Sequence, residues 1–444
     1  MHDLKQRQGQ FEQLVSDLLA EAKRQGASAA EAGVSSDAGL SVNVRMGEPE
    51  TVEYTRDNGL GVTVYFGKRK GSASTSDLTP EAVKETVQAA CNFARYTSED
   101  PCAGLAEAVL MAKAVPDLDL YHPWDLEIDD AIAKAQACEA AAQAKDARIV
   151  NSEGASLSSH NGLQIYGNSH GFIGGFPSSR HSLSCAVVGK QGESMQRDYW
   201  YTLSRIGTEL ETPEAVGQRA AERTLARLGA RRISTREAPV LFQADVAVGL
   251  LRSFIGAIRG GALYRKASFL LDQLDQPVFP EFVHIHEQPL LPRGLGSAPF
   301  DSEGVATRER DFISDGILRS YVLDSYSACK LGMRTTGNGG GVRNLRIDSG
   351  NLDRDGLLRR MDTGLLVTEL MGQGVNNVTG DYSRGAAGFW VERGEIQFPV
   401  EEITIAGNLK AMFMGLQEVG TDVETRTSVQ TGSWLIDKMM IAGE

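Results

Sequence analysis

Two spacings of apolar positions alternate along the first half of the chain. Before Gly26, apolar residues recur at the spacing of one helical face: Phe11, Leu14, Val15, Leu18 and Leu19. This spacing predicts an amphipathic helix that ends near the glycine. Every second residue is then apolar from Leu40 to Met46, and again from Leu60 to Phe66. A period of two predicts half-buried strands, and the Asp57-Asn58-Gly59 sequence between the two runs predicts a turn.

A five-residue sequence, TPEAV, occurs at 79–83 and again at 212–216. Threonine suits a helix N-cap, proline suits the first helical position, and glutamate suits the positive end of the helix dipole. Before the second copy, an alanine-rich helix is predicted over 127–145, followed by glycine-punctuated strands to about 205. The recurring order of helix, strands and helix indicates an internal duplication. The alternative is that TPEAV is only a common way to open a helix.

The pattern changes after Arg231 and Arg232. A strongly apolar helix is predicted first, with its face formed by Val246, Leu250, Leu251, Phe254, Ile255 and Ile258. Glycine-rich strands and turns are then expected to the C-terminus. The predicted class is α+β, with a duplicated helix–β-meander–helix N-terminal region and a β-rich, glycine-rich C-terminal domain. The expected domains are 1–232, with halves of about 1–110 and 115–232, and 233–444.

Composition indicates which classes of binding partner and which cellular compartment to expect. The 444 residues carry a formal net charge of −13, and no dense block of Lys and Arg is present, so nucleic acid is not expected as a partner. The polar start has no apolar signal segment, and no apolar run is long enough to span a membrane. Five scattered cysteines without a C-x-x-C motif predict free thiols in a reducing, cytoplasmic compartment.

The most distinctive local sequence is the glycine-rich loop at 335–345, TTGNGGGVRNL. Its glycines permit positive φ angles and close approach of another backbone. An unfolded peptide is gripped independently of its sequence through its backbone, so the loop is a candidate peptide-binding site. The candidate residues are Gly337, Asn338, Gly339, Gly340, Gly341 and Asn344. The alternative is a flexible loop or a tight strand crossing; the sequence is not a P-loop.

Other candidate sites are weaker. His284 and His286 lie on one face of an expected strand and suit a shared metal, but no third ligand is evident. The alternative is two partly exposed histidines. His160, His170 and His181 are scattered through a Gly/Ser-rich region that also contains Cys185. The polar cluster Asp381, Tyr382, Ser383 and Arg384 lacks a nucleophile elbow, and there is no H-E-x-x-H motif.

A long segment at 372–410 carries a family resemblance: GQGVNNVTGDYSRGAAGFWVERGEIQFPVEEITIAGNLK. It is very similar to the C-terminal signature of the PmbA/TldD family, in particular of its PmbA (TldE) type of subunit. The glycine-rich loop resembles the family's preceding motif. The TPEAV helices and the stretch DNGLGVTVYFGKRKGSAST resemble its N-terminal region. The resemblance covers nearly the whole chain.

The resemblance also shows which residues are missing. TldD-type subunits carry H-E-x-x-x-H on a helix, followed by an Arg-Lys pair, and a C-terminal cysteine that completes a zinc site. Counting back from Arg265-Lys266 places Arg252, Ser253 and Ala257 at the His, Glu and His positions. None of these side chains offers a zinc ligand or a good general base. We therefore expect no catalytic or metal-binding residues in this chain.

The family implies a role and a partner. It implies a heterodimer with a TldD-type subunit that holds the zinc, acting as a cytoplasmic metalloprotease on unfolded or short peptides. Peptide-antibiotic (microcin) maturation, antitoxin turnover and modulation of DNA gyrase are associated with it. This chain would be the non-catalytic subunit that completes a closed chamber; whether it also forms a homodimer is open. The alternatives are an independent peptidase with an unrecognised site, and a non-proteolytic module that binds gyrase or a toxin.

Overall fold

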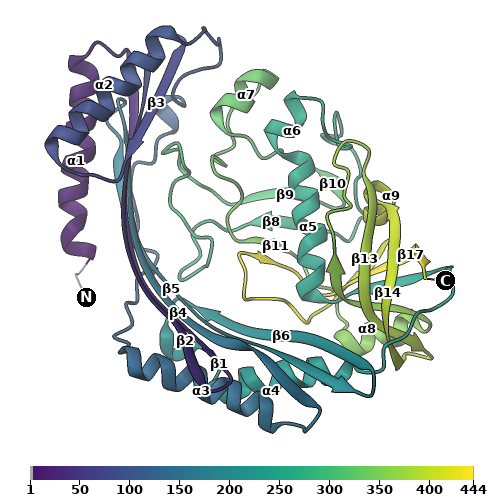
Figure 1. Cartoon of the computed structure of the whole chain (residues 1–444). Helices are drawn as coiled ribbons and strands as arrows, with labels where there is room; N and C mark the ends of the chain where they lie inside the picture. Colours follow the sequence, from purple (N-terminus) through teal and green to yellow (C-terminus); the bar gives the residue numbers. More distant parts are fainter. Residues whose placement is uncertain (1–3, 444) are drawn as a thin grey trace.

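The computed structural model describes residues 4–443 and confirms the predicted α+β class (Figure 1). A long, curved sheet forms the N-terminal region, and a C-terminal domain of short helices and two further sheets packs inside its concave face. None of the helices between residues 4 and 443 is long and apolar enough to cross a membrane.

The N-terminal region consists of two units with the same order of elements, a helix, three strands and a helix. The first unit contains α1 (Leu4–Arg24), β1 (Ala29–Arg45), β2 (Glu48–Phe66), β3 (Arg69–Thr75) and α2 (Pro80–Tyr96). The second unit contains α3 (Ile128–Ala144), β4 (Ile149–Asn168), β5 (Ile173–Gln191), β6 (Ser194–Ser204) and α4 (Pro213–Ala226). Short 3-10 turns follow α2 and β6, at Ala108–Leu110 and Gly207–Glu209.

Both units contribute to one antiparallel sheet with the strand order β3-β2-β1-β4-β5-β6. The central strands β1 and β4 pair from Glu31 with Asn168 to Val44 with Ala155, and this pairing joins the two units edge to edge in one sheet. The helix pairs α1/α2 and α3/α4 cover the convex face (Figure 1). Each helix pair packs on its own apolar core, because every second side chain of the underlying strands points toward the helices on the convex face.

The TPEAV sequences open helices in both units. The Thr79 hydroxyl accepts a hydrogen bond from Ala82 N at 3.4 Å, and the Thr212 hydroxyl accepts one from Ala215 N at 3.3 Å. In each helix a proline takes the first position, where its missing N–H has no intrahelical partner to lose. The repeated sequence therefore performs the same capping role twice.

The turn predicted at Asp57-Asn58-Gly59 is wrong. These residues lie inside β2, which pairs without interruption with Ser35–Asp37 of β1. The chain instead reverses at Met46 and Gly47, which have φ angles of 53° and 83°. Two consecutive residues with positive φ form the tight turn whose twist suits a hairpin. The hairpin is therefore much longer than the alternating runs alone suggest.

The C-terminal domain begins with a buried strand and the predicted apolar helix α5. Its helices are α5 (Ala244–Ile258), α6 (Gly260–Tyr264), α7 (Ser325–Leu331), α8 (Arg354–Met361) and α9 (Leu409–Met414). Its strands are β7 (Arg236–Phe242), β8 (Ile285–Glu287), β9 (Arg310–Ser314), β10 (Ile317–Leu318), β11 (Leu345–Ile347), β12 (Gly364–Met371), β13 (Asp381–Glu392), β14 (Glu395–Asn408), β15 (Leu416–Val419), β16 (Val429–Gln430) and β17 (Trp434–Ala442).

These strands form two sheets around one large core. The first has the order β14-β13-β12-β7-β17-β15, and it closes on itself because β14 also pairs with β17. The second has the order β10-β9-β8-β11-β16. The buried face of α5 fills the space between them with Leu251 and Phe254, which pack in the same cluster as Trp434. The C-terminal domain thus holds α5 firmly in place.

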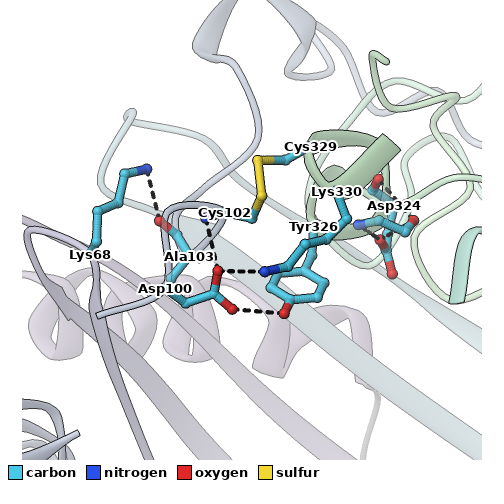
Figure 2. The surroundings of a disulfide bond; sticks show 9 residues. Lys68, Asp100, Cys102, Ala103, Asp324, Tyr326, Cys329 and Lys330 are labelled. Atoms are coloured by element: carbon cyan, nitrogen blue, oxygen red, sulfur yellow. Dashed lines mark hydrogen bonds and ion pairs between the residues drawn. A yellow bond between two sulfur atoms is a disulfide. The ribbon is translucent and has the colours of Figure 1, made fainter. Parts of the chain in front are cut away.

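The prediction that all five cysteines are free thiols is wrong for two of them. Cys102, in the segment after α2, forms a disulfide with Cys329 of α7 (Figure 2). The pairing could not be read from the sequence because 227 residues separate the two cysteines and only the tertiary fold brings them together. Cys91, Cys138 and Cys185 are free and buried, as expected.

Candidate functional site

Helix α5 carries Arg252, Ser253 and Ala257, the three residues that the resemblance assigned to the positions of the zinc ligands and general base. The hydroxyl of Ser253 donates to Gly249 O at 2.9 Å, so it is engaged within its own helix. Ala257 is fully buried, and its carbonyl accepts a hydrogen bond from Ser268 Oγ at 2.6 Å. Arg252 is exposed and lies in the wall of a cavity. At these three positions α5 offers a cation, a hydroxyl bonded within its own helix and a buried methyl group, and none of these is a zinc ligand.

The cavity has a volume of about 200 Å³ and lies between the N-terminal sheet and the C-terminal domain. Its walls come from β6, α4, α5 and the segment before β16, and its lining residues are Tyr199, Trp200, Tyr201, Arg223, Asp245, Val248, Arg252, Glu424, Arg426 and Thr427. A wider hollow of about 480 Å³ shares Trp200, Asp245, Glu424 and Arg426 with it. Together they form one cleft, which we call the β6–α5 cleft.

Stacked aromatic and guanidinium groups build one side of the β6–α5 cleft. The Arg426 guanidinium lies 3.7 Å from the ring centre of Trp200, and Arg219 covers the same ring at 4.8 Å. Arg426 also donates to Tyr201 O at 3.0 Å and forms an ion pair with Glu424. Such contacts fix both planar groups, because a guanidinium is attracted to an aromatic face and keeps its donors for oxygen partners.

Charge in the cleft is only partly paired. Arg223 bridges Asp198 and Asp245 at 3.2 and 3.3 Å, and burial raises the pKa of Asp245. Arg252 has no carboxylate within ion-pair distance among the described side chains. Its Nη2 donates to the hydroxyl of Thr427 at 3.2 Å. Arg252 therefore presents a positive charge to the cleft that is free to bind an anionic group.

The glycine-rich loop lies between α7 and β11, and two buried carboxylates accept hydrogen bonds from it. Glu287 accepts hydrogen bonds from the Asn338 amide and from Arg343 N, and Asp301 accepts one from Gly339 N at 2.8 Å. Gly337, Gly340 and Gly341 have φ angles of 73°, 84° and 116°, a region that suits glycine. The loop is therefore a fixed structure and not a flexible one.

The predicted peptide-contacting residues of the loop divide into two groups. Gly337, Asn338, Gly339 and Asn344 are buried. The Asn344 amide donates to Gln288 O and Ser297 Oγ, at 2.8 and 2.6 Å, so both asparagine amides are already used inside the protein. Gly340 and Gly341 lie nearer the surface. A backbone contact with a peptide stays a prediction, and it is sterically open only at Gly340 and Gly341.

The loop and the β6–α5 cleft are neighbours through one short segment. Leu345 N, at the end of the loop, donates to Ser428 O at 2.8 Å, and Leu345 pairs with Val429 in parallel strands. Thr427, the preceding residue, lines the cleft and bonds Arg252. The end of the loop is therefore hydrogen-bonded to the segment 427–429 that forms part of the cleft wall.

The histidines considered as metal ligands have separate partners. His284 directly precedes β8 and His286 lies within it, with their ring centres 6.1 Å apart. Their acidic neighbours are different residues, Asp311 and Asp348. His181 is buried 2.9 Å from Ser159 Oγ, and His170 lies 3.1 Å from Ala106 O. No group of three or more potential ligands suited to a metal occurs within residues 4–443.

The polar cluster at the start of β13 is divided between the two faces of the strand. Asp381 accepts a hydrogen bond from Thr379 Oγ1 at 2.6 Å, and this contact lowers its pKa. Tyr382 points into the core, where burial raises its pKa to about 12. Ser383 is exposed, with no histidine bonded to it among the described residues. The cluster has no arrangement for nucleophilic catalysis.

Sequence reasoning missed the aromatic and arginine residues of the β6–α5 cleft. Two signals for them exist. Tyr199-Trp200-Tyr201 places three aromatics in succession in an otherwise alternating strand, and Arg219 and Arg223 are spaced i, i+4 on α4. Neither signal points to Arg426, which comes from a loop more than 200 residues later. Only the tertiary structure brings it onto Trp200.

Comparisons with known proteins agree with this architecture. Family models match domain 1 (residues 30–94), the central domain (121–228) and the C-terminal domain (235–443) of the PmbA/TldA metallopeptidases. The chain is 54% identical over 426 residues to "Metalloprotease PmbA" of Escherichia coli O157:H7, covering 96% of this chain and 94% of that one. It is 51% identical over 443 residues to a PmbA homolog of Haemophilus influenzae, covering 99% and 98%.

Solved structures show the same fold. A candidate modulator of DNA gyrase from Bacteroides thetaiotaomicron matches with a TM-score of 0.93 and 30% identity, covering 98% of this chain and 99% of that one. TldE from Thermococcus kodakarensis matches with a TM-score of 0.85 and 21% identity, covering 97% and 100%. A relative named as a TldD homolog, from Buchnera aphidicola, is 21% identical over 394 residues, covering 84% and 80%. The chain belongs to the PmbA/TldD metallopeptidase family.

Proposed function

We propose that this chain is the non-catalytic, PmbA (TldE)-type subunit of a cytoplasmic metalloprotease that acts on unfolded or short peptides. The observation that carries this proposal is the chemistry of α5. Arg252 faces the cleft as a free cation, Ser253 is bonded to its own helix, and Ala257 is buried. The zinc and its general base would then come from a TldD-type partner.

The β6–α5 cleft supports peptide binding by this subunit. Aromatic rings with fixed planes suit the side chains of a peptide, and a free guanidinium suits a carboxylate. Tyr199 is 49% exposed and its ring stacks on Tyr201 with 6.4 Å between centres, so an apolar surface is available beside Arg252. The subunit would hold the peptide while the partner cleaves it.

Metal analysis combined with a cleavage assay tests the proposal. The purified chain should contain no stoichiometric zinc and should not cleave an unfolded peptide such as reduced, alkylated casein. Addition of a TldD-type subunit should give cleavage that a chelator abolishes. About one zinc per isolated chain, lost when His284 and His286 are replaced by alanine, would contradict it. Cleavage by the chain alone would instead favour an independent peptidase.

A second candidate function comes from the solved structures that are described as candidate modulators of DNA gyrase. In that case the chain binds gyrase or a toxin without proteolysis. A supercoiling assay with purified gyrase distinguishes the two functions. An effect of the isolated chain on supercoiling, in the absence of any TldD-type subunit, would favour the second.

A further inference from the structure

We propose that Cys102 and Cys329 form a reversible thiol–disulfide modification site, which fastens the N-terminal region to the C-terminal domain. The two cysteines come from different parts of the fold, with Cα atoms 5.5 Å apart across the contact between them (Figure 2). Cys329 is exposed on α7 and Cys102 is partly exposed, whereas Cys91, Cys138 and Cys185 are buried. Thiol chemistry with solutes is therefore confined to this pair.

Beside the disulfide, the contact consists of polar groups near the surface. Asp100 accepts hydrogen bonds from Lys330 Nζ at 2.9 Å and from the Tyr326 hydroxyl at 2.7 Å (Figure 2). Arg334 pairs with Glu107 through two hydrogen bonds, at 2.8 and 2.6 Å. Exposed ion pairs contribute little to stability because water competes for both partners. The covalent bond is thus the strongest link between α7 and the first part of the segment that follows α2, residues 97–112.

The other end of the segment is anchored by apolar packing. Ala106 and Met111 are buried in one cluster with Phe172, Phe300 and Val305. Ala306 N also donates to Leu110 O at 3.0 Å. These contacts do not depend on the disulfide. Reduction should therefore release residues 97–104 and α7 from each other while the apolar end of the segment stays in place.

Release of α7 affects the glycine-rich loop, because the loop follows α7 after three residues. Thr335 and Thr336 fix the start of the loop by donating to Leu323 O, at 3.0 and 3.1 Å. Leu323 directly precedes Asp324, the N-cap of α7. Cys329 lies near the C-terminal end of α7, so the disulfide tethers the part of the helix from which the chain continues into the loop.

The chemistry is an ordinary thiol–disulfide exchange with a cellular dithiol or glutathione. A reductant thiolate attacks Cys329 Sγ, the bond to Cys102 Sγ breaks, and Cys102 leaves as a thiolate that takes up a proton. A second reductant thiol then attacks the mixed disulfide and releases Cys329. The two cysteine sulfurs gain two electrons and two protons, and the reductant leaves as its disulfide.

Differential alkylation of the full chain tests the bond itself. Protein purified without reductant and alkylated under denaturing conditions should carry labels on Cys91, Cys138 and Cys185, and dithiothreitol should add labels on Cys102 and Cys329. Peptide mapping assigns them. In folded, reduced protein, Cys329 should react fastest. Labelling of all five cysteines before any reduction, after exposure to an oxidised glutathione buffer, would overturn the proposal.

Limited proteolysis tests the conformational consequence. A glutamyl endopeptidase should cleave at the exposed Glu99 several times faster in reduced than in oxidised protein. Cys102→Ser and Cys329→Ser should each be cleaved at the fast rate with or without dithiothreitol, whereas Cys91→Ala should keep the response of the native chain. Equal cleavage rates in oxidised and reduced native protein would show that the bond does not control this segment.

Discussion

The side-chain amide of Asn338 donates hydrogen bonds to both carboxylate oxygens of Glu287, at 2.8 and 3.1 Å. Both residues are buried, and burial raises the pKa of Glu287. Arg343 N donates to the same carboxylate at 2.9 Å, so Glu287 bonds two separate points of the glycine-rich loop. Asn338 thus uses its amide inside the protein, where it connects the glycine-rich loop to β8.

Asn338→Ala should destabilise the chain by about 2–3 kcal/mol, because it leaves a buried carboxylate without two of its hydrogen bonds. Urea denaturation followed by circular dichroism measures the change. The control is Asn351→Ala, at an exposed position, which should change stability by less than about 0.5 kcal/mol. If the two variants behaved alike, the Asn338–Glu287 contact would not hold the loop.

Gly340 is the loop position at which a peptide contact can be tested. A Cβ atom there would meet its nearest neighbours at 3.5 Å, whereas at Gly339 it would lie 2.9 Å from Asp301 and Ser302. Gly340→Ala should cost about 1–2 kcal/mol, because φ is +84°. The variant should still fold and pair with a TldD-type subunit, but the resulting complex should cleave peptide more slowly than the complex with the native chain. Unchanged cleavage would remove the loop from the peptide site.

The sequence predicted the elements that depend on local chemistry and failed where distant segments meet. The TPEAV caps and the apolar face of α5 were predicted because each is encoded within a few residues. The Cys102–Cys329 bond and the contact of Arg426 with Trp200 were not, because each joins segments more than 200 residues apart. The predicted peptide-binding asparagines are instead buried, with Asn338 donating to the Glu287 carboxylate and Asn344 donating to Gln288 O and Ser297 Oγ.

The turn between β1 and β2, which the sequence placed at residues 57–59, lies at Met46 and Gly47 and leads to a stability prediction. The reversal at Met46 and Gly47 was missed because methionine is uncommon at positive φ, whereas Asn-Gly is the usual sequence. Met46→Asn should therefore stabilise the chain by about 0.5–1 kcal/mol, since the side chain is 56% exposed and little burial is lost. The midpoint of urea denaturation reports it. A lower midpoint would mean that the Met46 side chain contributes to packing that its exposure hides.

Glu303 should make stability depend on pH. Burial, with the charges of Asp301 and Asp324, raises its pKa from 4.5 to about 7, against the hydrogen bonds from Ser325. Because the folded-state pKa lies above the unfolded value, the stabilisation is fully present below about pH 4.5 and is lost as pH rises through 7. Stability should fall by at most about 3 kcal/mol between pH 5 and pH 8 from this group.

Glu303→Gln should flatten this pH dependence, since the amide does not ionise. Denaturation midpoints at pH 5, 6, 7 and 8 give the comparison, and Glu309→Gln, at an exposed position of the same segment, is the matched control. The control should follow the native profile. A Glu303→Gln profile parallel to the native one would show that Glu303 titrates near its ordinary pKa.

Arg252 provides the most direct test of peptide binding in the β6–α5 cleft. Arg252→Gln keeps a polar, though shorter, side chain and removes the charge. A charge-assisted hydrogen bond to a carboxylate contributes about 1.5–3 kcal/mol, so its loss should weaken binding about tenfold or more. Folding should be unaffected, because Arg252 is exposed and has a single hydrogen bond at 3.2 Å, to Thr427. Fluorescence anisotropy of a labelled unfolded peptide measures the dissociation constant.

The chemistry of the peptide then identifies what Arg252 recognises. A peptide with a free C-terminal carboxylate and no acidic side chains should bind native protein more tightly than its C-terminal amide, and Arg252→Gln should abolish the difference. Arg259→Gln, an exposed arginine just beyond the end of α5 and outside the cleft walls, should retain it. Equal binding of both peptides by native protein would exclude carboxylate recognition by Arg252 while leaving peptide binding intact. An identical loss in Arg259→Gln would mean that general positive charge, and not the cleft, attracts the peptide.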